Sequence, residues 1–469
     1  MIYDKFLIDE LSVIAIYSKV KEIFDEKIFL FESVINNTDG NYSFIVIGEK
    51  ERVKYKNNKT YYFNGEKEEV LDIDVFKFLK DYYKNIDYKY YRQKSKEIGI
   101  GFVDGFIGYI GYDMVKVFEP ILKPVMDNLK DETEIPDFYM IRPKIILGFS
   151  HKSSELTVII NDEDYNDKLL IIKNSLKSSY KHLPLQKVKI LKEPKFVFSK
   201  EKFFEMVKNA KENIRAGDIF QIVLSNRLKV KAKLDRLSFY RKLRSKNPSP
   251  YLYYLDIDDF AIIGSSPEVM VRLNDNMILL RPIAGTRKRG DSPLRDLELE
   301  KDMINDPKEV AEHIMLVDLG RNDVGRVARA GTVKVEELMR VERYSHVMHM
   351  VSDVVGVLDR KYNMFDLFKA TFTAGTMSGA PKIKAMELIA RYEGLKRGYY
   401  AGSIGYFGFD GNMDSAITIR TALIKGDEII FQAGAGIVAD SKPELEYKEV
   451  NNKLGALVAT LKELENGSN

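Results

Sequence analysis

The sequence contains no cysteine and no tryptophan, and histidine occurs only five times among its 469 residues. Without cysteine the chain cannot form a disulfide, a thiolate zinc site or a cysteine nucleophile, which is compatible with a reducing cytoplasm. No segment approaches the ~18 uninterrupted apolar residues that a membrane-spanning helix needs. The first segment, MIYDKFLIDELSVIAIY, mixes acidic residues into a short apolar run, so we expect no signal peptide.

The sequence also has no large excess of either charge. The 73 Lys and Arg residues nearly match the 70 Asp and Glu residues, the net charge is +3, and both signs are interspersed. This balance gives no electrostatic reason to expect a nucleic-acid partner. The length is too great for one small core and predicts a large domain or two interlocked ones. The basic stretch 180–198 carries two prolines and predicts the boundary between domains 1–190 and 195–465.

The stretch that dominates the chain is EIIFQAGAGIVADSKPELEYKEVNNK, residues 428–453. Its apolar run predicts a buried strand, which then enters a small-residue segment made of Gly434, Ala435 and Gly436. We expect backbone N–H groups there to be able to approach a ligand, because glycine has no Cβ, and the strand to resume through Val438. The plainer interpretation is a strand that ends in an ordinary glycine turn.

A helix should follow this strand. Ser441 and Glu444 have the spacing of a capping box. Glu446, Glu449 and Lys453 then stand at i, i+3 and i+7, so they lie near one face. Carboxylates one turn beyond backbone donors suit a metal-bound carboxylate ligand. A solvated acidic helix explains the same pattern equally well.

A second acidic helix is predicted after Asp306, a capping residue that precedes Pro307. Its expected apolar seam is Val310, Ile314 and Val317, from which Glu312 points away. Glu312 alone is most simply a solvated surface carboxylate. Paired with the helix over 441–465 it makes a two-helix Mg²⁺ site geometrically possible, since Mg²⁺ takes one or two protein carboxylates and completes its shell with water and substrate oxygens.

Three further segments carry candidate chemistry. Gly285 and Thr286 are expected in a turn that binds a carboxylate, or in a plain loop. His349 has a side chain suited to proton transfer, although a histidine on an apolar strand is more often a core residue. The small-residue loop 373–382, which contains Thr376, opens a helix and is a plausible anion cradle.

Arg420 lies within a predicted strand over 416–424. An arginine projecting from a strand among small residues is a good bidentate clamp for a carboxylate. The alternative is an ordinary surface arginine.

Together these segments resemble the chorismate-utilising enzymes, most closely the large subunits of anthranilate synthases. The resemblance covers nearly the whole chain. It is carried by six motifs in order: PIAGTRKRG (282–290), AEHIMLVDLGRNDVGRV (311–327), YSHVMHMVS (344–352), TAGTMSGAPKIKAMELI (373–389), GYYAGSIGYF (398–407) and QAGAGIVADSKPELEYKE (432–449).

The resemblance implies a magnesium-dependent lyase that makes anthranilate and pyruvate, the first committed step of tryptophan biosynthesis. Glu312 and Glu449 would hold Mg²⁺, which bridges to the ring carboxylate of chorismate. Glu268 would be the acid for loss of the C4 hydroxyl, His349 would serve pyruvate elimination, and Thr376 would be a third catalytic residue. The substrate-binding residues would be Gly285, Thr286, Tyr400, Arg420, Gly434, Ala435, Gly436 and Lys453.

The implied fold is α+β, with two interlocked domains built on large antiparallel sheets, sandwich-like, and helices packed outside. Two positions separate sister reactions within the family. Aminodeoxychorismate synthases often carry a lysine where this chain has Ala284. Isochorismate and salicylate synthases use a lysine where this chain has Gln221, and a neutral amide cannot serve as that base. Both differences favour anthranilate.

A regulatory site is also implied. Segments 31–33, 40–44 and 247–252 look like the tryptophan feedback pocket of the anthranilate enzymes, with Phe31-Glu32 where the family usually has Leu-Glu. Ser33, Pro250, Tyr251 and Leu252 would contact tryptophan, although 247–252 is also explained as a proline turn.

The source of ammonia follows from the missing cysteine. Lacking a glutaminase nucleophile, the chain would depend on a glutamine amidotransferase subunit, as a hetero-oligomer, or on free ammonia. Two other hypotheses stay open: an aminodeoxychorismate synthase component I, which serves folate synthesis, and a tryptophan-binding regulatory protein without catalysis.

Overall fold

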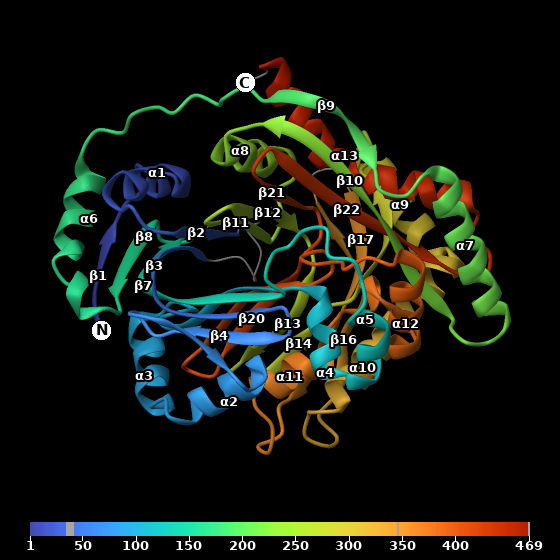
Figure 1. The fold of residues 1–469 in the computed structure, drawn as a ribbon, viewed down its shortest axis with the longest axis horizontal. Coiled ribbons are helices and arrows are strands. Elements are labelled where there is room, and N and C mark those ends of the chain that lie inside the picture. Colours follow the sequence, from blue (N-terminus) through green and yellow to red (C-terminus); the bar gives the residue numbers. More distant parts are fainter. Residues whose placement is uncertain (34–41, 345–346, 468–469) are drawn as a thin grey trace.

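The computed structural model describes residues 1–33, 42–344 and 347–467. Two parts of the expected sites therefore lie outside the described residues: residues 40–41 of the expected tryptophan pocket and residues 345–346 of the motif YSHVMHMVS. No helix in the described ranges is long and apolar enough to cross a bilayer. Helices alternate with antiparallel strands that are linked into one hydrogen-bonded network (Figure 1). This mixture confirms the predicted α+β class.

Two long strands, β3 (Tyr42–Lys56) and β7 (Phe138–Ser150), pair with each other and are shared by two sheets. Their register shifts between Glu49 and Glu51, where the pairing partners on the outer edges change. The first half of β3 pairs with β2, and the part of β7 opposite it pairs with β8. The second half of β3 pairs with β4, and the part of β7 opposite it pairs with β6. The first sheet continues through β1 (Ile2–Leu7), β8 (Glu155–Ile160), β2 (Ile28–Glu32), β11 (Tyr251–Ile257), β12 (Phe260–Ser266), β21 (Thr421–Lys425), β22 (Glu428–Ile437), β10 (Gln221–Lys233), β9 (Lys189–Phe196) and β18 (Gly379–Ala380).

The second sheet leads from the other half of this strand pair toward the carboxyl-terminal part of the chain. One of its strands, β17, pairs with three others. Its members are β5 (Glu68–Leu71), β4 (Lys59–Phe63), β6 (Gly105–Ile110), β19 (Ser403–Gly408), β20 (Met413–Ile417), β13 (Val269–Asn274), β14 (Met277–Leu280), β15 (Ile283–Lys288), β16 (Lys334–Arg343) and β17 (Val347–Val357).

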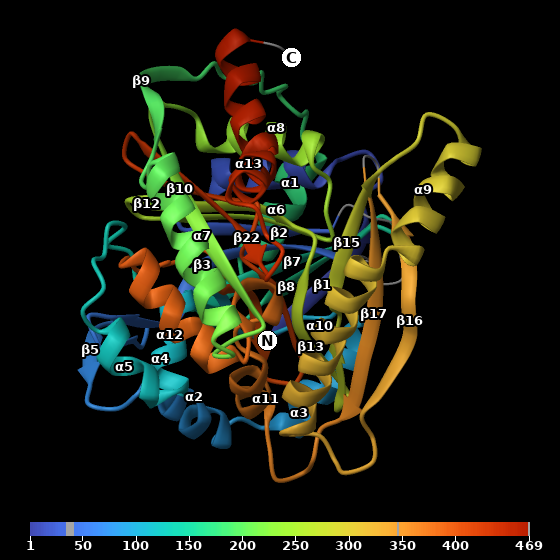
Figure 2. The same ribbon diagram turned by 90° about the vertical axis from the view of Figure 1, so that its right-hand side faces the viewer.

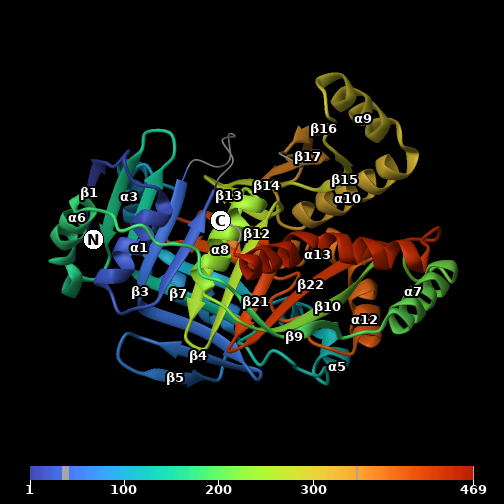
Figure 3. The ribbon, with the colours of Figure 1, turned by 90° about the horizontal axis from the view of Figure 1, so that it is seen from above.

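Helices lie outside the sheets. Helices α1, α8 and α13 cover one side and α2, α3 and α11 the opposite side (Figures 1 and 2), while α9 projects from the body next to β15 and β16 (Figures 2 and 3). Their bounds are α1 Val13–Ile23, α2 Val75–Lys84, α3 Tyr88–Ile98, α4 Val115–Phe118, α5 Lys123–Met126, α6 Lys168–Lys177, α7 Lys200–Arg215, α8 Arg236–Lys246, α9 Pro293–Asn305, α10 Pro307–Gly325, α11 Met364–Thr371, α12 Lys382–Glu393 and α13 Pro443–Asn466, with 3₁₀ turns η1 Tyr112–Met114, η2 Pro120–Leu122, η3 Glu163–Tyr165 and η4 Gly375–Met377.

Strand β2 shows how the two cores are separated. Its side chains alternate: Phe29 belongs to the core that joins the two sheets, whereas Ile28 and Leu30 belong to the core beneath the outer helices. A strand covered on both faces needs an unbroken apolar run rather than an alternating pattern, and IFLF supplies it.

The two halves of the chain are joined by strand pairing rather than by a simple surface contact. Strand β2 pairs with β11, and β6 pairs with β19, so amino-terminal strands sit among carboxyl-terminal ones. Strand β9 spans the expected boundary and pairs with β10. The division into 1–190 and 195–465 stays a prediction.

Candidate functional site

The small-residue segment of β22 is continuous strand and not the glycine turn of the plainer interpretation. Gly434 lies opposite Ser225 of β10, and Gly436 lies opposite Val223. A Cβ on Gly434 would fall 2.9 Å from both the Leu224 carbonyl and the Tyr400 hydroxyl. The glycine is therefore required by close packing from the side, which the local sequence does not reveal.

Helix α13 follows without the predicted capping box. It begins at Pro443, and Lys442 makes no side-chain capping bond within the described part of the chain. The Ser441 hydroxyl accepts instead from the Val438 N–H at 3.1 Å and closes the link between strand and helix. Lys453 donates to the Gly434 carbonyl at 3.0 Å and pairs with Glu449 at 2.7 Å. This lysine joins the helix to the glycine segment of β22.

Helix α10 begins as predicted, since Asp306 accepts from the backbone N–H groups of the first turn. Its predicted apolar seam is wrong in part. Ile314 is 36% exposed, whereas His313 is fully buried, with Nε2 2.6 Å from the Ser352 hydroxyl of β17. The helix turns His313 toward β17, where Nε2 finds a hydrogen-bond partner while the buried Nδ1 has none among the described residues. Apolar periodicity cannot detect such a polar contact.

Glu312 lies at the partly buried edge of α10 and faces the glycine segment. Gln221 donates from Nε2 to its Oε1 at 3.2 Å, and the same carboxylate oxygen is 3.8 Å from a Cβ built on Gly436. Burial raises the pKa of Glu312, and the negative charges of Glu309 and Glu449 raise it further. Acidic side chains of two distant helices therefore converge on one strand.

This convergence fits a hard divalent cation. Glu449 is paired with Lys453, whereas Glu312 has no ion pair with a described residue and is repelled by the charges of Glu309 and Glu449, so a bound cation would relieve that repulsion. Throughout the described ranges no group of three or more His, Asp or Glu side chains is arranged to hold a metal. Two protein carboxylates with water and substrate oxygens remain a donor set that suits Mg²⁺.

Gly285 and Thr286 lie on β15, not in the turn or loop that was expected. The register of β15 against β17 shifts at Gly285, whose φ is 65°, so this residue forms a bulge. The bulge turns the Gly285 carbonyl toward His349 Nδ1 at 3.1 Å, and the Thr286 hydroxyl is equally close to Nδ1. A carbonyl can only accept, so Nδ1 carries the hydrogen and Nε2 of the neutral ring is free to take a proton. Burial lowers the pKa of His349, which favours this neutral form.

Glu268 follows β12 and is 7% exposed. Thr376, on η4, donates its hydroxyl to Glu268 Oε1 at 2.7 Å. Burial raises the pKa of the Glu268 carboxyl to about 7, against the lowering effect of that hydrogen bond and of the cations Lys453 and Arg420. Both residues line a small cavity of about 20 Å³. A carboxyl group whose pKa lies near 7 can donate a proton at physiological pH.

Arg420 is not on a continuous strand. It lies in the break between β20 and β21, with a φ of 52°. Its guanidinium makes no hydrogen bond or ion pair with any residue that the structure describes, and burial lowers its pKa. Its charge acts on Glu268, Tyr400 and His349, which places these four side chains in one neighbourhood. An incompletely balanced, partly buried cation is well suited to bind a carboxylate.

A second cluster of predicted residues meets at a cavity between the two halves of the chain. Ser33, Pro250, Tyr251 and Leu252 all line this cavity of about 220 Å³, together with several aromatic side chains. The Ser33 hydroxyl is buried and has no hydrogen-bond partner among the described residues. The sequence resemblance alone had brought these positions together.

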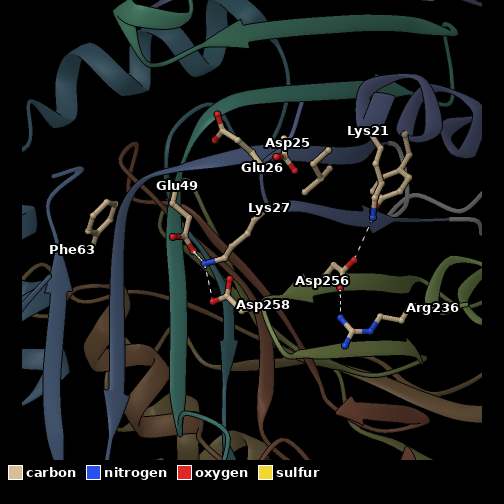
Figure 4. A pocket seen from close by; sticks show the side chains of 11 residues that line it. Lys21, Asp25, Glu26, Lys27, Glu49, Phe63, Arg236, Asp256 and Asp258 are labelled. Atoms are coloured by element: carbon tan, nitrogen blue, oxygen red, sulfur yellow. Dashed lines mark hydrogen bonds and ion pairs between the residues drawn. The ribbon is translucent and has the colours of Figure 1, made fainter. Parts of the chain in front are cut away.

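A larger open cavity, of about 600 Å³, lies elsewhere between α1, β3 and the β11–β12 turn (Figure 4). Its cations are all paired: Lys27 with Glu49 and Asp258, and both Lys21 and Arg236 with Asp256. Because these charges compensate one another, we assign no chemistry to this cavity.

One buried group at the site was missed from the sequence. Arg397 and Glu393 form an ion pair with side chains only 1% and 3% exposed. Their i, i+4 spacing, next to the segment GYYAGS, was the available signal, but such spacing is common on surface helices.

Comparison with known proteins comes from sequence and structure. The family described as chorismate binding enzyme matches residues 27–459. Anthranilate synthase component 1 of Aquifex aeolicus is 41% identical, over 98% of this chain and 94% of the relative. The same component of Thermus thermophilus is 38% identical, over 98% of both chains. The crystal structure of anthranilate synthase component I from Streptococcus pneumoniae superposes with a TM-score of 0.77 at 34% identity, covering 96% of this chain and 98% of that one.

Proposed function

The chain belongs to the family of chorismate binding enzymes, and we propose that it is the lyase component that converts chorismate and ammonia to anthranilate, pyruvate and water. The relatives named anthranilate synthase component 1 match it over nearly their full length, and neither alternative hypothesis is favoured by them. The observation that carries the proposal within the structure is the meeting of Glu268, Arg420 and the Glu312–Glu449 pair around one strand.

The first chemical step is amination. The ammonia nitrogen bonds to C2 of the ring, the double bonds shift, and the C4 hydroxyl leaves. Hydroxide is a poor leaving group, so the oxygen must be protonated as its bond to carbon breaks. Glu268 is the donor in this proposal, because burial raises its pKa to about 7, so that a large fraction of its carboxyl groups carries a proton near neutral pH, and the Thr376 hydroxyl holds one of its oxygens.

The second step is elimination. Loss of the proton at C2 and cleavage of the bond to the enolpyruvyl oxygen release pyruvate and leave an aromatic ring, which provides the driving force. We assign His349 to proton transfer in this step, since Nδ1 bonds the Gly285 carbonyl and Nε2 has no hydrogen-bond partner among the described residues. Gly285 and Thr286 fix the orientation of the ring from the other side.

Binding and orientation fall to the remaining residues. Arg420 and Lys453, with Tyr400 and the backbone of Gly434, Ala435 and Gly436, would grip the carboxylates of chorismate. Glu312 and Glu449 would hold Mg²⁺, which when bound neutralises the ring carboxylate and holds the ring in place. Such positioning lowers the barrier by removing the entropy cost of alignment.

Partner and regulation extend the proposal. Because the chain has no cysteine, ammonia from glutamine requires a separate amidotransferase subunit. The 220 Å³ cavity lined by Ser33, Pro250, Tyr251 and Leu252 is the proposed site for tryptophan as feedback inhibitor. A cytoplasmic location stays a prediction.

The test is direct. The purified chain is mixed with chorismate, magnesium and an ammonium salt, and anthranilate fluorescence is followed beside pyruvate release. We expect the two products in equal amounts and none without ammonium. Consumption of chorismate without anthranilate, unless a separate lyase is added, would instead indicate an aminodeoxychorismate synthase.

A further inference from the structure

The buried Arg397 has contacts on both sides of the site. We propose that it is a positioning residue that fixes the spacing between the Glu268–Thr376 side and the Gly434–Gly436 side of the proposed active site. The inference rests on the proposed function. Arg397 is 1% exposed and lies just beyond α12, where it contacts protein groups rather than the reacting atoms.

The first contact reaches the loop that carries Thr376. Arg397 donates from Nη1 to the Met377 carbonyl at 2.8 Å. Met377 is the last residue of η4 and directly follows Thr376, whose hydroxyl holds Glu268. Fixing the Met377 carbonyl therefore fixes the donor that orients the proposed acid.

The second contact reaches β10. Arg397 donates from Nη2 to the Val223 carbonyl at 2.7 Å, and Val223 lies opposite Gly436. Glu393 bonds both Nε and Nη2 of Arg397, and its Oε1 also accepts from the N–H and hydroxyl of Ser225, which lies opposite Gly434. The ion pair thus holds the two residues of β10 that lie opposite Gly434 and Gly436.

The third contact is with Tyr400, a proposed substrate residue. The guanidinium carbon is 5.6 Å from the centre of the Tyr400 ring. It also contacts Tyr112, whose ring centre is 4.8 Å away. One planar guanidinium group therefore contacts two backbone carbonyls, a carboxylate and two tyrosine rings. Lysine carries the same charge but has no planar fork, so it cannot hold both carbonyls at this spacing.

The experiment compares Arg397→Lys with a matched control, Arg227→Lys. Arg227 is also 1% exposed and bonds Gln432 and the Lys396 carbonyl, but it does not bond η4. We expect Arg397→Lys to lower kcat about 10- to 100-fold, the cost of a misplacement near 1 Å, with KM for chorismate changed by less than about threefold. Arg227→Lys should leave kcat within about twofold, at a comparable loss of thermal stability.

The pH profile adds a readout that lost stability alone would not move. The Thr376 hydrogen bond lowers the pKa of Glu268, and the charges of Lys453 and Arg420 also lower it. If Thr376 is displaced in Arg397→Lys, the decline of kcat at high pH should move to higher pH, while the control keeps the wild-type profile. An unmoved decline, with kcat equal to that of the control, would make Arg397 a structural residue only.

Two further outcomes have to be distinguished: a variant that does not fold, and a wild-type chain that forms no anthranilate. If Arg397→Lys does not fold, Glu393→Gln loosens the same ion pair, and an unchanged kcat and pH profile in that variant would overturn the inference. Absence of anthranilate formation by the wild-type chain would refute the proposed function, and this inference with it. Normal wild-type turnover with no difference between the two arginine variants would refute the inference alone.

Discussion

At the scale of single residues, the site holds one cation, Arg420, near a carboxyl group without pairing the two. Arg420 forms no ion pair with a described residue, although its charge acts on Glu268. Burial raises the pKa of the Glu268 carboxyl to about 7. Removing a charge from water without a partner costs free energy, so this arrangement is unfavourable in the empty protein. A dianionic ligand would supply the missing partner for Arg420, and its binding recovers that cost.

Glu268→Gln tests the proposed acid. The amide oxygen can still accept from Thr376, but the side chain has no acidic proton, so we expect turnover to fall at least about 100-fold. In the wild-type chain kcat should decline as pH rises through about 7, where Glu268 loses its proton. Steady-state rates of anthranilate formation between pH 5 and 9 provide the measurement. A variant that retains this decline at more than a tenth of wild-type activity would contradict the assignment.

The same substitution has a predicted effect on stability. The pKa of Glu268 rises from 4.5 to about 7 on folding, so the folded state binds the proton more tightly than the unfolded state. Its contribution is therefore fully present below pH 4.5 and is lost as pH rises toward 7, a change on the order of 3 kcal/mol. Urea unfolding at pH 5 and pH 8 should show a smaller pH-dependent loss in Glu268→Gln than in the wild-type chain.

Glu312→Gln and Glu449→Gln test the metal site. Each removes one carboxylate and should abolish magnesium-dependent turnover. Independently of activity, chorismate with magnesium and no ammonium should raise the melting temperature of the wild-type chain but not of either variant. Glu444→Gln, an exposed position in the first turn of α13, is the matched control and should behave as wild type. Thermal shift in a Glu312→Gln chain equal to wild type would remove these residues from the site.

At the scale of elements, local signals predicted the helices better than the strands. The start of α10 was predicted correctly because Asp306 caps it through bonds to residues two and three positions away. The bulge at Gly285 and the unbroken course of β22 depend on partner strands far away in the sequence. A glycine looks the same in the sequence whether a turn, a bulge or a close neighbour requires it, so the sequence could indicate candidate residues but not the backbone that carries them.

Gly285→Ala tests the bulge. Its φ of 65° costs an alanine about 1–2 kcal/mol, and the new methyl group would meet Met303 at 3.3 Å. We expect that loss of unfolding free energy together with lower activity, because the Gly285 carbonyl orients His349. Gly331→Ala is the control, since its φ of 77° gives a similar strain with no described atom within 4 Å of the added Cβ. The two variants should lose similar stability in chemical unfolding, but only Gly285→Ala should lose turnover.

At the scale of the whole molecule, strand pairing between the two halves builds the second site. Strand β2 pairs with β11, so Glu32 lies opposite Leu252 and Ser33 comes to line the same cavity as Pro250. More than 200 residues separate these partners in the chain, as their numbers show. No local pattern encodes such a pairing, and only the resemblance to the family placed these segments together. A ligand in this cavity contacts both halves and can therefore affect how they sit against each other.

Ser33→Phe tests that cavity as the tryptophan site. The phenyl ring would occupy space that the indole needs, so we expect tryptophan affinity to fall at least about tenfold, whereas Ser33→Ala, which removes one hydrogen-bonding group, should cost about fivefold. Because the chain has no tryptophan, indole fluorescence excited beyond the tyrosine band reports the ligand alone. Inhibition of anthranilate formation, taken relative to each variant's own uninhibited rate, should weaken in the same order. Wild-type affinity in Ser33→Phe would place tryptophan outside the cavity that the two halves form together.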